Sequence, residues 1–196
     1  MPREARQIEN NAYYHILTRG NDRKRIFRCT GDFLYFIRLV IQTRQKHPVV
    51  IYHYCLMNNH MHFLVKALDS KELPRFFQIL FQRYACYFRK RYRHTGYLFQ
   101  NRYKSYHIDR DDYLLECARY IERNPVRADM AKFPQEYRWT SYLHYAEGQE
   151  NDIIKEPNPL YKVLAGTDPE RRKIYKDYII QDRLYEHIVD KGLKIQ

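Results

Sequence analysis

Two histidines stand two residues apart in the stretch NNHMHFLV, at the start of an apolar run. Alternate residues of a β-strand point to the same face, so His60 and His62 are predicted to project together. Met61 and Phe63 would then turn toward the opposite side. Two imidazoles side by side are half of a metal site, although an isolated pair of this kind is more often structural.

A second group that could do chemistry lies in DDYLLECARYIERNP, residues 111–125. Its helical periodicity predicts an apolar face made of Tyr113, Leu114, Cys117, Ala118 and Ile121. Tyr120 falls at the margin of that face, and Asn124 lies one turn further along on the same side. The predicted helix therefore presents a phenol and a carboxamide as a pair.

Other tyrosines compete with Tyr120 for a chemical role. Tyr103 and Tyr106 lie in a basic predicted strand, and Tyr113 lies seven residues before Tyr120 on the same predicted helix. Each is more simply explained as a core ring or as a ring that stacks on a base. The residues alone leave Tyr120 as one candidate among several.

The composition favours a nucleic-acid partner. The 196-residue chain carries 35 Lys and Arg against 23 Asp and Glu, and the resulting charge of +12 is typical of a protein that binds a polyanion. Tyrosines and phenylalanines are interleaved with these cations in QRYACYFRKRYRH, and such a mixture suits stacked bases and phosphates. An enzyme that is basic for other reasons is the alternative reading.

The cysteines and the apolar runs exclude other classes of protein. Cys29, Cys55, Cys86 and Cys117 include no close pair, so neither a zinc ribbon nor a disulfide framework is indicated. The opening MPREARQIENN lacks the apolar segment of a signal peptide, and no apolar run approaches the length of a membrane span. We expect a cytoplasmic protein with no membrane partner.

The predicted elements follow the order strand, helix, strand, strand, helix, strand, helix. Strands are expected at residues 12–19, 49–57, 60–68 and 97–108. Helices are expected from Thr30 or Asp32 to about residue 45, from Asp69 or Ser70 to about residue 94, and from Asp109 or Asp111 to Pro125. This order predicts an α+β domain in which helices pack on an antiparallel sheet.

The chain is long enough for one domain with a full core, and we assign residues 1–146 to it. Residues 147–159 are polar and broken by prolines, and residues 169–191 have the pattern of one helix or two. Residues 147–196 are therefore predicted to be a linker followed by a helical C-terminal extension.

Separated motifs along the chain resemble those of one known family. NNHMHFLV, GYLFQNRYKS, DDYLLECARYIERNPVRADM and WTSY occur in an order similar to that of the single-tyrosine HUH transposases of the insertion-sequence type and their REP-associated tyrosine transposase relatives. The resemblance covers residues 13–145. It implies the ferredoxin-like fold of HUH endonucleases, and metal-dependent cleavage and strand transfer of single-stranded DNA, at hairpins, during transposition.

The resemblance also gives the candidate residues their roles. His60 and His62 match the paired metal ligands, Asn124 the third ligand, and Tyr120 the nucleophile that would form a 5′-phosphotyrosine. The insertion-sequence branch usually has Gln in place of Asn124, and Asn is similar to the REP-associated branch. The expected cation is Mg²⁺ or Mn²⁺, of which Mn²⁺ is better suited to imidazole.

Basic residues around this set are candidates for DNA binding. They occur in three runs, represented by Arg19, Arg23, Arg83, Arg102 and Lys104. A charge run is usually a solvated face, but three runs around one site favour a groove for single-stranded or hairpin DNA. Some relatives join their sheets edge to edge as dimers and others act as monomers, and we expect a homodimer.

Two other functions stay open at this point. The fold could be retained as a module that grips DNA hairpins, with cleavage weak or lost. A metal phosphodiesterase that activates a water molecule would leave Tyr120 dispensable. Retention of labelled DNA on the denatured protein would distinguish the three functions.

Overall fold

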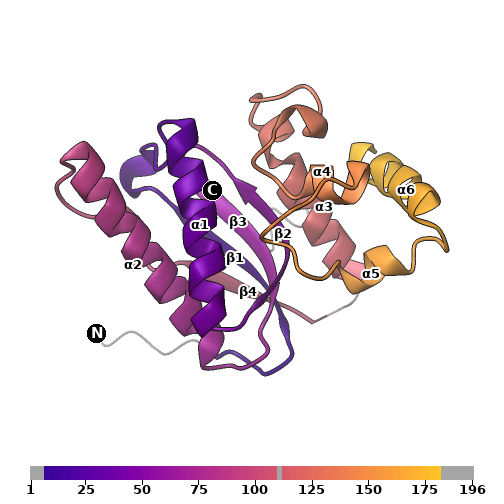
Figure 1. The fold of residues 1–196 in the computed structure, drawn as a ribbon, viewed down its shortest axis with the longest axis horizontal. Helices are drawn as coiled ribbons and strands as arrows, with labels where there is room; N and C mark the ends of the chain where they lie inside the picture. Colours follow the sequence, from indigo (N-terminus) through magenta and orange to yellow (C-terminus); the bar gives the residue numbers. More distant parts are fainter. Residues whose placement is uncertain (1–6, 110–111, 182–196) are drawn as a thin grey trace.

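The computed structural model describes residues 7–109 and 112–181. Within these ranges the strands form a four-stranded antiparallel sheet in the order β2-β3-β1-β4 (Figure 1). The strands are β1 (Tyr13–Arg19), β2 (Val50–Leu56), β3 (His60–Lys66) and β4 (Lys104–Ile108). The antiparallel sheet and the hairpin of β2 and β3 that the sequence predicted are confirmed.

Long helices cover both faces of this sheet (Figure 1). α1 (Thr30–Lys46) and α2 (Glu72–Tyr92) lie together on one face, and α3 (Asp112–Arg127) packs on β2 and β3 from the other. The shorter elements are η1 (Asn21–Arg23), η2 (Pro134–Glu136), α4 (Tyr142–Glu147), α5 (Pro159–Lys162) and α6 (Asp168–Ile180). The α+β architecture predicted from the element order is therefore confirmed.

The two-residue period of β3 separates the two faces. Phe63 points toward α2, where its ring centroid lies 5.7 Å from that of Phe77. Leu64 belongs instead to the apolar cluster formed with α3. His60 and His62 have the same parity as Leu64, so both face α3, as the alternation predicted.

The outer edge of β2 is covered by the segment that precedes α4. Leu56 donates its backbone N–H to the Trp139 carbonyl at 2.9 Å, and Ser141 donates its backbone N–H to the Tyr54 carbonyl at 3.0 Å. A single antiparallel bridge joins Cys55 and Thr140 between them. The WTSY motif thus satisfies backbone groups that would otherwise leave an exposed sheet edge.

Pro125 does not end α3, contrary to the prediction, because the helix continues to Arg127. Proline has no N–H group, so it removes one hydrogen bond from the helix. The Ala128 N–H nevertheless bonds the Asn124 carbonyl at 3.0 Å, and the Met130 N–H bonds the Pro125 carbonyl at 2.9 Å. Since the lost bond falls near the end of the helix, the last turn survives.

The strand predicted at residues 97–108 is interrupted, and β4 begins only at Lys104. Gln100 still donates its backbone N–H to the Arg19 carbonyl at 3.0 Å, beyond which the chain leaves the ladder. Tyr103 turns into the core in this interval, with its ring centroid 5.3 Å from that of Phe77. Two expectations, a cap at Asp111 and helix at residues 182–191, lie outside the described residues.

A buried carboxylate on α3 joins several segments of the chain. Glu122 is fully buried and accepts hydrogen bonds from Ser141 Oγ at 2.5 Å and from the Tyr175 hydroxyl of α6 at 2.8 Å. His53 of β2 donates from Nδ1 to Glu122 at 2.9 Å, and Asn158 Nδ2 donates to the other nitrogen of His53 at 3.1 Å. These donors compensate the cost of burying the carboxylate.

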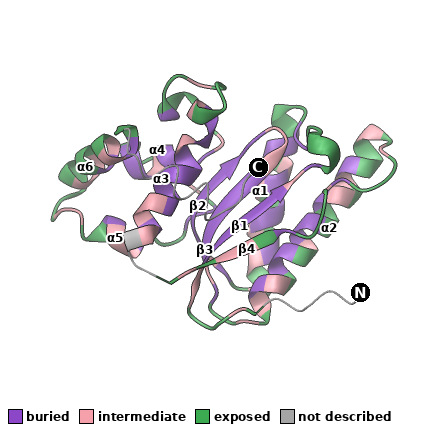
Figure 2. Cartoon of the chain, turned by 180° about the vertical axis from the view of Figure 1, so that it is seen from behind, coloured by how far each residue is buried: buried purple, intermediate pink, exposed green. Residues whose placement is uncertain are grey.

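The same helix also holds the end of α6. Arg123 donates from Nη1 to the carbonyl of Ile180 at 2.7 Å, and Arg119 donates from Nε to the carbonyl of Tyr178 at 3.2 Å. Positive charge at the C-terminus of a helix is favourable because carbonyls there lack partners. Figure 2 shows the inner sides of α3 and α4 buried where these segments meet.

We expect Tyr175→Phe to lower the free energy of unfolding by about 1.5–3 kcal/mol, because Glu122 would lose a hydrogen bond to a buried charged group. The midpoint of urea denaturation measures the loss. Tyr178→Phe is the matched control on the same helix, since its hydroxyl bonds Glu116 at 2.7 Å in a partly buried position. Equal losses in the two variants would contradict a special contribution of the buried carboxylate.

Candidate active site

The histidine pair lies at the start of β3, next to the turn from β2. His60 and His62 face Arg19 and Leu17 of β1 in the register of the sheet. Their ring centroids are 5.0 Å apart, and the ring planes meet at 84°. His62 is fully buried and His60 is partly exposed. The two rings are therefore close neighbours at one edge of a packed region.

α3 places Tyr120 and Asn124 beside this pair. The Tyr120 ring centroid lies 5.7 Å from that of His62, with the planes at 82°. Asn124 donates from Nδ2 to the Tyr120 carbonyl at 2.8 Å, and its side chain also hydrogen-bonds His60. Tyr120 is 4% exposed and Asn124 is 9% exposed. The structure thus brings together the four residues that the sequence singled out.

The nitrogen and oxygen atoms of these side chains form a set that fits a divalent cation, which would replace the hydrogen bond between His60 and Asn124. Asn59 Oδ1 lies 2.7 Å from His60 Nδ1, which leaves Nε2 of that ring. Nε2 of His62 is buried and has no hydrogen-bond partner among the described residues. Asn124 uses its amide nitrogen on Tyr120, which leaves its oxygen. Two imidazole nitrogens and one amide oxygen are neutral donors that suit Mn²⁺, and less well Mg²⁺.

An amide is the candidate for a third donor beside the two imidazoles. In residues 7–109 and 112–181, no group of three His, Cys, Asp or Glu side chains could hold a metal ion. Two histidines supply only part of a coordination shell, and Asn124, which hydrogen-bonds His60, is the neighbouring amide whose oxygen suits such a cation.

Burial keeps the two imidazoles in the neutral form that a ligand requires. It lowers the pKa of His60 to about 4, with the charge of Arg19 acting in the same direction and the hydrogen bond to Asn124 opposing it. Burial also lowers the pKa of His62 well below its usual value, and unfavourable interactions with His60, His15 and the charged Arg127 act in the same direction. Both rings therefore remain neutral at physiological pH.

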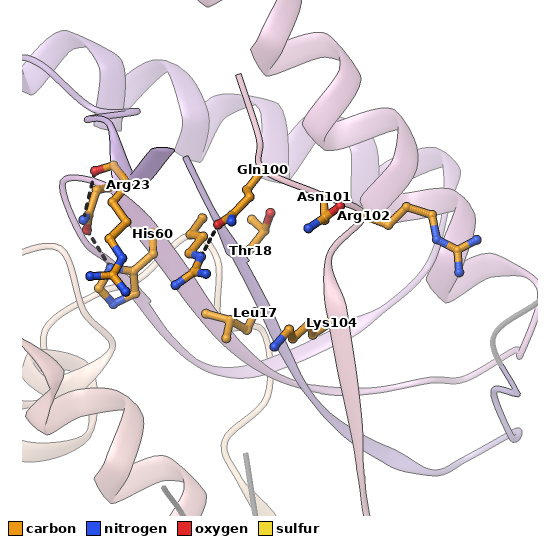
Figure 3. Close-up of a pocket in the computed structure, with 10 residues that line it drawn as sticks. Leu17, Thr18, Arg23, His60, Gln100, Asn101, Arg102 and Lys104 are labelled. Carbon is orange, nitrogen blue, oxygen red and sulfur yellow. Dashed lines mark hydrogen bonds between the residues drawn. The ribbon is translucent and has the colours of Figure 1, made fainter. Parts of the chain in front are cut away.

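A basic pocket of about 330 Å³ opens beside His60. Its polar lining includes Arg19, Arg23, Gln100, Arg102 and Lys104. Figure 3 shows Arg23 and His60 at one end of the pocket, while Arg102 extends away from them. The loop between α2 and β4 thus completes one wall, and β1 forms its floor. Four of the five cations predicted to bind DNA, Arg19, Arg23, Arg102 and Lys104, therefore line the pocket that opens beside His60.

Comparison with known proteins identifies the family. The model of the IS200-like transposases matches residues 9–124, which is more than half of the chain and includes the histidine pair and the two α3 residues. The chain belongs to the IS200-like transposase family. As a member, this transposase is a DNA-cleaving enzyme in general terms. No curated protein matches the chain.

Comparison with solved structures shows which proteins this chain resembles in fold. A REP-associated tyrosine transposase bound to a REP hairpin matches 80% of this chain and 92% of its own, with a TM-score of 0.63 and 14% sequence identity. A candidate transposase from Deinococcus radiodurans matches 69% of this chain and 95% of its own, with a TM-score of 0.42 and 15% identity. The first match shows that the transposase has the fold of the REP-associated enzymes, as the motifs implied.

Arg83 is the one predicted DNA-binding residue that lies elsewhere. It belongs to α2, on the face of the sheet opposite the histidines, and donates from Nη2 to Gln42 Oε1 of α1 at 2.8 Å. A shallow depression there is lined also by Tyr35, Tyr87 and Lys90. The basic end of α2 is thus separated from the site by the sheet, a separation that charge runs in the sequence do not reveal.

Two residues that the sequence reasoning did not single out lie against the site. The Arg127 guanidinium carbon is 5.0 Å from the centroid of the Tyr120 ring. Its seven-residue spacing from Tyr120 is a helical signal that could have indicated this contact. The His15 ring of β1 stacks on His62, with centroids 5.1 Å apart. No spacing predicts that contact, because it depends on strand register.

The length and composition of the helices can be compared with those of a membrane span. Among the residues that the structure describes, none of the helices combines the length and the apolar character needed to cross a membrane.

We expect Lys104→Gln to weaken binding of single-stranded DNA and to lower the slope of log affinity against log salt by about one, because one phosphate contact is lost. Fluorescence anisotropy with a labelled oligonucleotide at several salt concentrations measures both quantities. The matched variant Arg83→Gln removes the same charge from the far face and should leave affinity and slope unchanged. A larger loss in Arg83→Gln would assign DNA binding to α2 instead.

Proposed function

We propose that this transposase cleaves single-stranded DNA next to a hairpin and transfers the cut strand, in a metal-dependent reaction that passes through a 5′-phosphotyrosine on Tyr120. The observation that supports it is the assembly of His60, His62, Asn124 and Tyr120 at one place, from two elements far apart in the sequence. A protein that only binds DNA has no need of two neutral imidazoles beside a tyrosine.

The proposed chemistry starts from the difficulty of cutting DNA. A phosphodiester resists attack because its oxygens are negative, and the departing 3′ oxygen is a poor leaving group. A Mg²⁺ or Mn²⁺ ion held by His60, His62 and Asn124 would polarise the phosphate and stabilise the charge on that oxygen. Two hydrogen bonds already in place would orient the proposed ligands: His60 Nδ1 donates to Asn59 Oδ1, and Asn124 Nδ2 donates to the Tyr120 carbonyl of α3.

Tyr120 is proposed as the attacking group. Its phenolic oxygen forms a bond to phosphorus while the bond from phosphorus to the 3′ oxygen breaks. The phenolic proton passes to water, and the departing 3′ oxygen takes a proton from water and leaves as a hydroxyl. The phosphotyrosine linkage conserves the bond for rejoining. Arg127 holds its charge 5.0 Å from the Tyr120 ring centroid, where it favours the negative charge that the phenol acquires.

The proposed substrate lies in the basic pocket beside His60. Arg19, Arg23 and Lys104 line that pocket and would contact phosphates. The REP-associated transposase with the same fold is bound to a REP hairpin, and on this basis we propose hairpin DNA as the substrate. Arg102, which extends along the same wall, would follow the strand away from the site.

The homodimer expected from the resemblance stays a prediction, and the sheet restricts its form. Trp139 and Ser141 already occupy the outer edge of β2 within the chain. A second copy that joined the sheet edge to edge would therefore have to pair with β4.

We expect Tyr120→Phe to keep DNA affinity and to abolish the covalent adduct, because only the phenolic oxygen is removed while the ring stays packed. A denaturing gel with 5′- and 3′-labelled hairpin DNA detects DNA retained on the protein. Tyr113→Phe, on the same helix, is the control and should form the adduct at the parent level.

The same gel tests the rival functions. Cleavage by Tyr120→Phe at the parent rate, without adduct in either protein, would mean that a water molecule attacks. Binding without cleavage in the parent protein would leave a hairpin-binding module.

We expect Asn124→Ala to raise the Mn²⁺ concentration needed for half-maximal cleavage, because the site would lose one of its few ligands. Asn124→Gln should restore part of the effect, since it keeps an amide oxygen. Melting temperatures of both variants separate this from the alternative that Asn124 only stabilises the end of α3. A lower melting temperature with an unchanged Mn²⁺ midpoint would contradict the ligand role.

A further inference from the structure

A third histidine lies behind the pair. His15 of β1 is 1% exposed, and its ring stacks on His62 with an interplanar angle of 15°. Nε2 of His15 lies 2.9 Å from Nδ1 of His62, which is hydrogen-bonding distance. His15 also meets the edge of the Tyr120 ring, with centroids 5.9 Å apart. It therefore contacts both the proposed ligand and the proposed nucleophile without belonging to either group.

The position of one proton in the hydrogen bond between His15 and His62 decides whether His62 can bind a metal. A hydrogen bond between two ring nitrogens needs a proton on one of them and a lone pair on the other. If His15 Nε2 carries the proton, it donates to Nδ1 of His62. Neutral His62 then carries its proton on Nε2, and a protonated Nε2 cannot bind a metal. Where His62 Nδ1 carries the proton, Nε2 of His62 presents a lone pair. The two arrangements differ only in tautomer, but only the second makes His62 a ligand.

Both rings are buried, with His15 1% and His62 0% exposed, and burial favours the neutral form of an imidazole. Each ring then holds a single N–H, so the two tautomers are coupled through their shared bond.

The surroundings of His60 show how a neighbouring group selects one tautomer. Its Nδ1 lies 2.7 Å from Asn59 Oδ1, while the Asn59 Nδ2 donates to the Arg23 carbonyl at 3.3 Å. The amide is thus held with its oxygen toward the ring, and an oxygen can only accept. His60 Nδ1 must donate, which leaves its Nε2 as the lone pair.

We propose that His15 is a positioning residue that accepts a hydrogen bond from His62 Nδ1 and so holds His62 Nε2 ready to ligate a divalent cation. The proposal rests on the metal site of the proposed function. Nε2 of His62 and Nδ1 of His15 are the two ring nitrogens of this bonded pair that lack a partner in the described residues. A cation would satisfy the first, and this selects the tautomer in which His15 accepts.

Two substitutions at position 15 separate the tautomer role from packing. His15→Phe keeps a flat ring against His62 and Tyr120 but removes the acceptor. His15→Gln loses the ring but keeps an oxygen that can accept. We expect Mn²⁺ affinity, measured by electron paramagnetic resonance without DNA, to fall about tenfold or more in His15→Phe and to remain near the parent value in His15→Gln. His107→Phe, an exposed position of β4 on the other face, is the control and should bind like the parent.

The opposite ranking, with His15→Phe near the parent and His15→Gln weakened, would show a packing role and overturn the proposal. The parent isotherm tests the proposed function separately, because a parent that binds no Mn²⁺ has no metal site for His15 to serve. A second readout uses ¹⁵N chemical shifts of the histidine rings in the parent loaded with Zn²⁺. We expect a proton on Nδ1 of His62 and none on Nε2 of His15, and the reverse would overturn the proposal whatever the variants do.

Discussion

The placement of α3 across β2 and β3 is the constraint on which the candidate site depends. β3 presents its histidines by strand geometry alone, but Tyr120 and Asn124 reach them only because α3 lies against that face. Apolar contact brings the helix to the sheet without fixing its rotation, since hydrophobic attraction has no direction. The rotation of α3 about its own axis is fixed instead by directed hydrogen bonds from Ser141 and Tyr175 to Glu122. Glu122 stands between the two site residues in the sequence, so its bonds also set the angle at which they face the histidines.

β3 serves the core and the site at once. Phe63 buries its ring against α2, while His62 on the other face is buried just as fully. Full burial keeps the imidazole neutral, and it also leaves Nε2 of that ring without a partner. A buried polar atom without a hydrogen bond costs about 1–3 kcal/mol. Such a cost is understandable where the atom serves the function, and a bound cation would remove it.

The segment after α3 stabilises the strand and the helix that carry the site. Trp139 to Ser141 covers the edge of β2, and α6 brings Tyr175 to the buried carboxylate of α3. Arg123 in turn holds the last carbonyls of α6. The division predicted at residue 146 stays a prediction, but the helix that carries the proposed nucleophile contacts residues on both sides of it. The family match ends at residue 124, so Trp139, Ser141 and Tyr175 lie in a part of the chain that the family model does not cover.

The sequence by itself determined the local geometry of the candidate site. The two-residue period of a strand placed His60 and His62 on one face, and the helical period placed Asn124 one turn beyond Tyr120, because both follow from backbone geometry. The order of the elements likewise predicted the sheet and its helices. Only the tertiary structure decided which groups meet: the strand register set His15 against His62, and the sheet separated Arg83 from the histidines. Charge and propensity act along the chain, whereas register and the choice of face follow from how all the elements pack together.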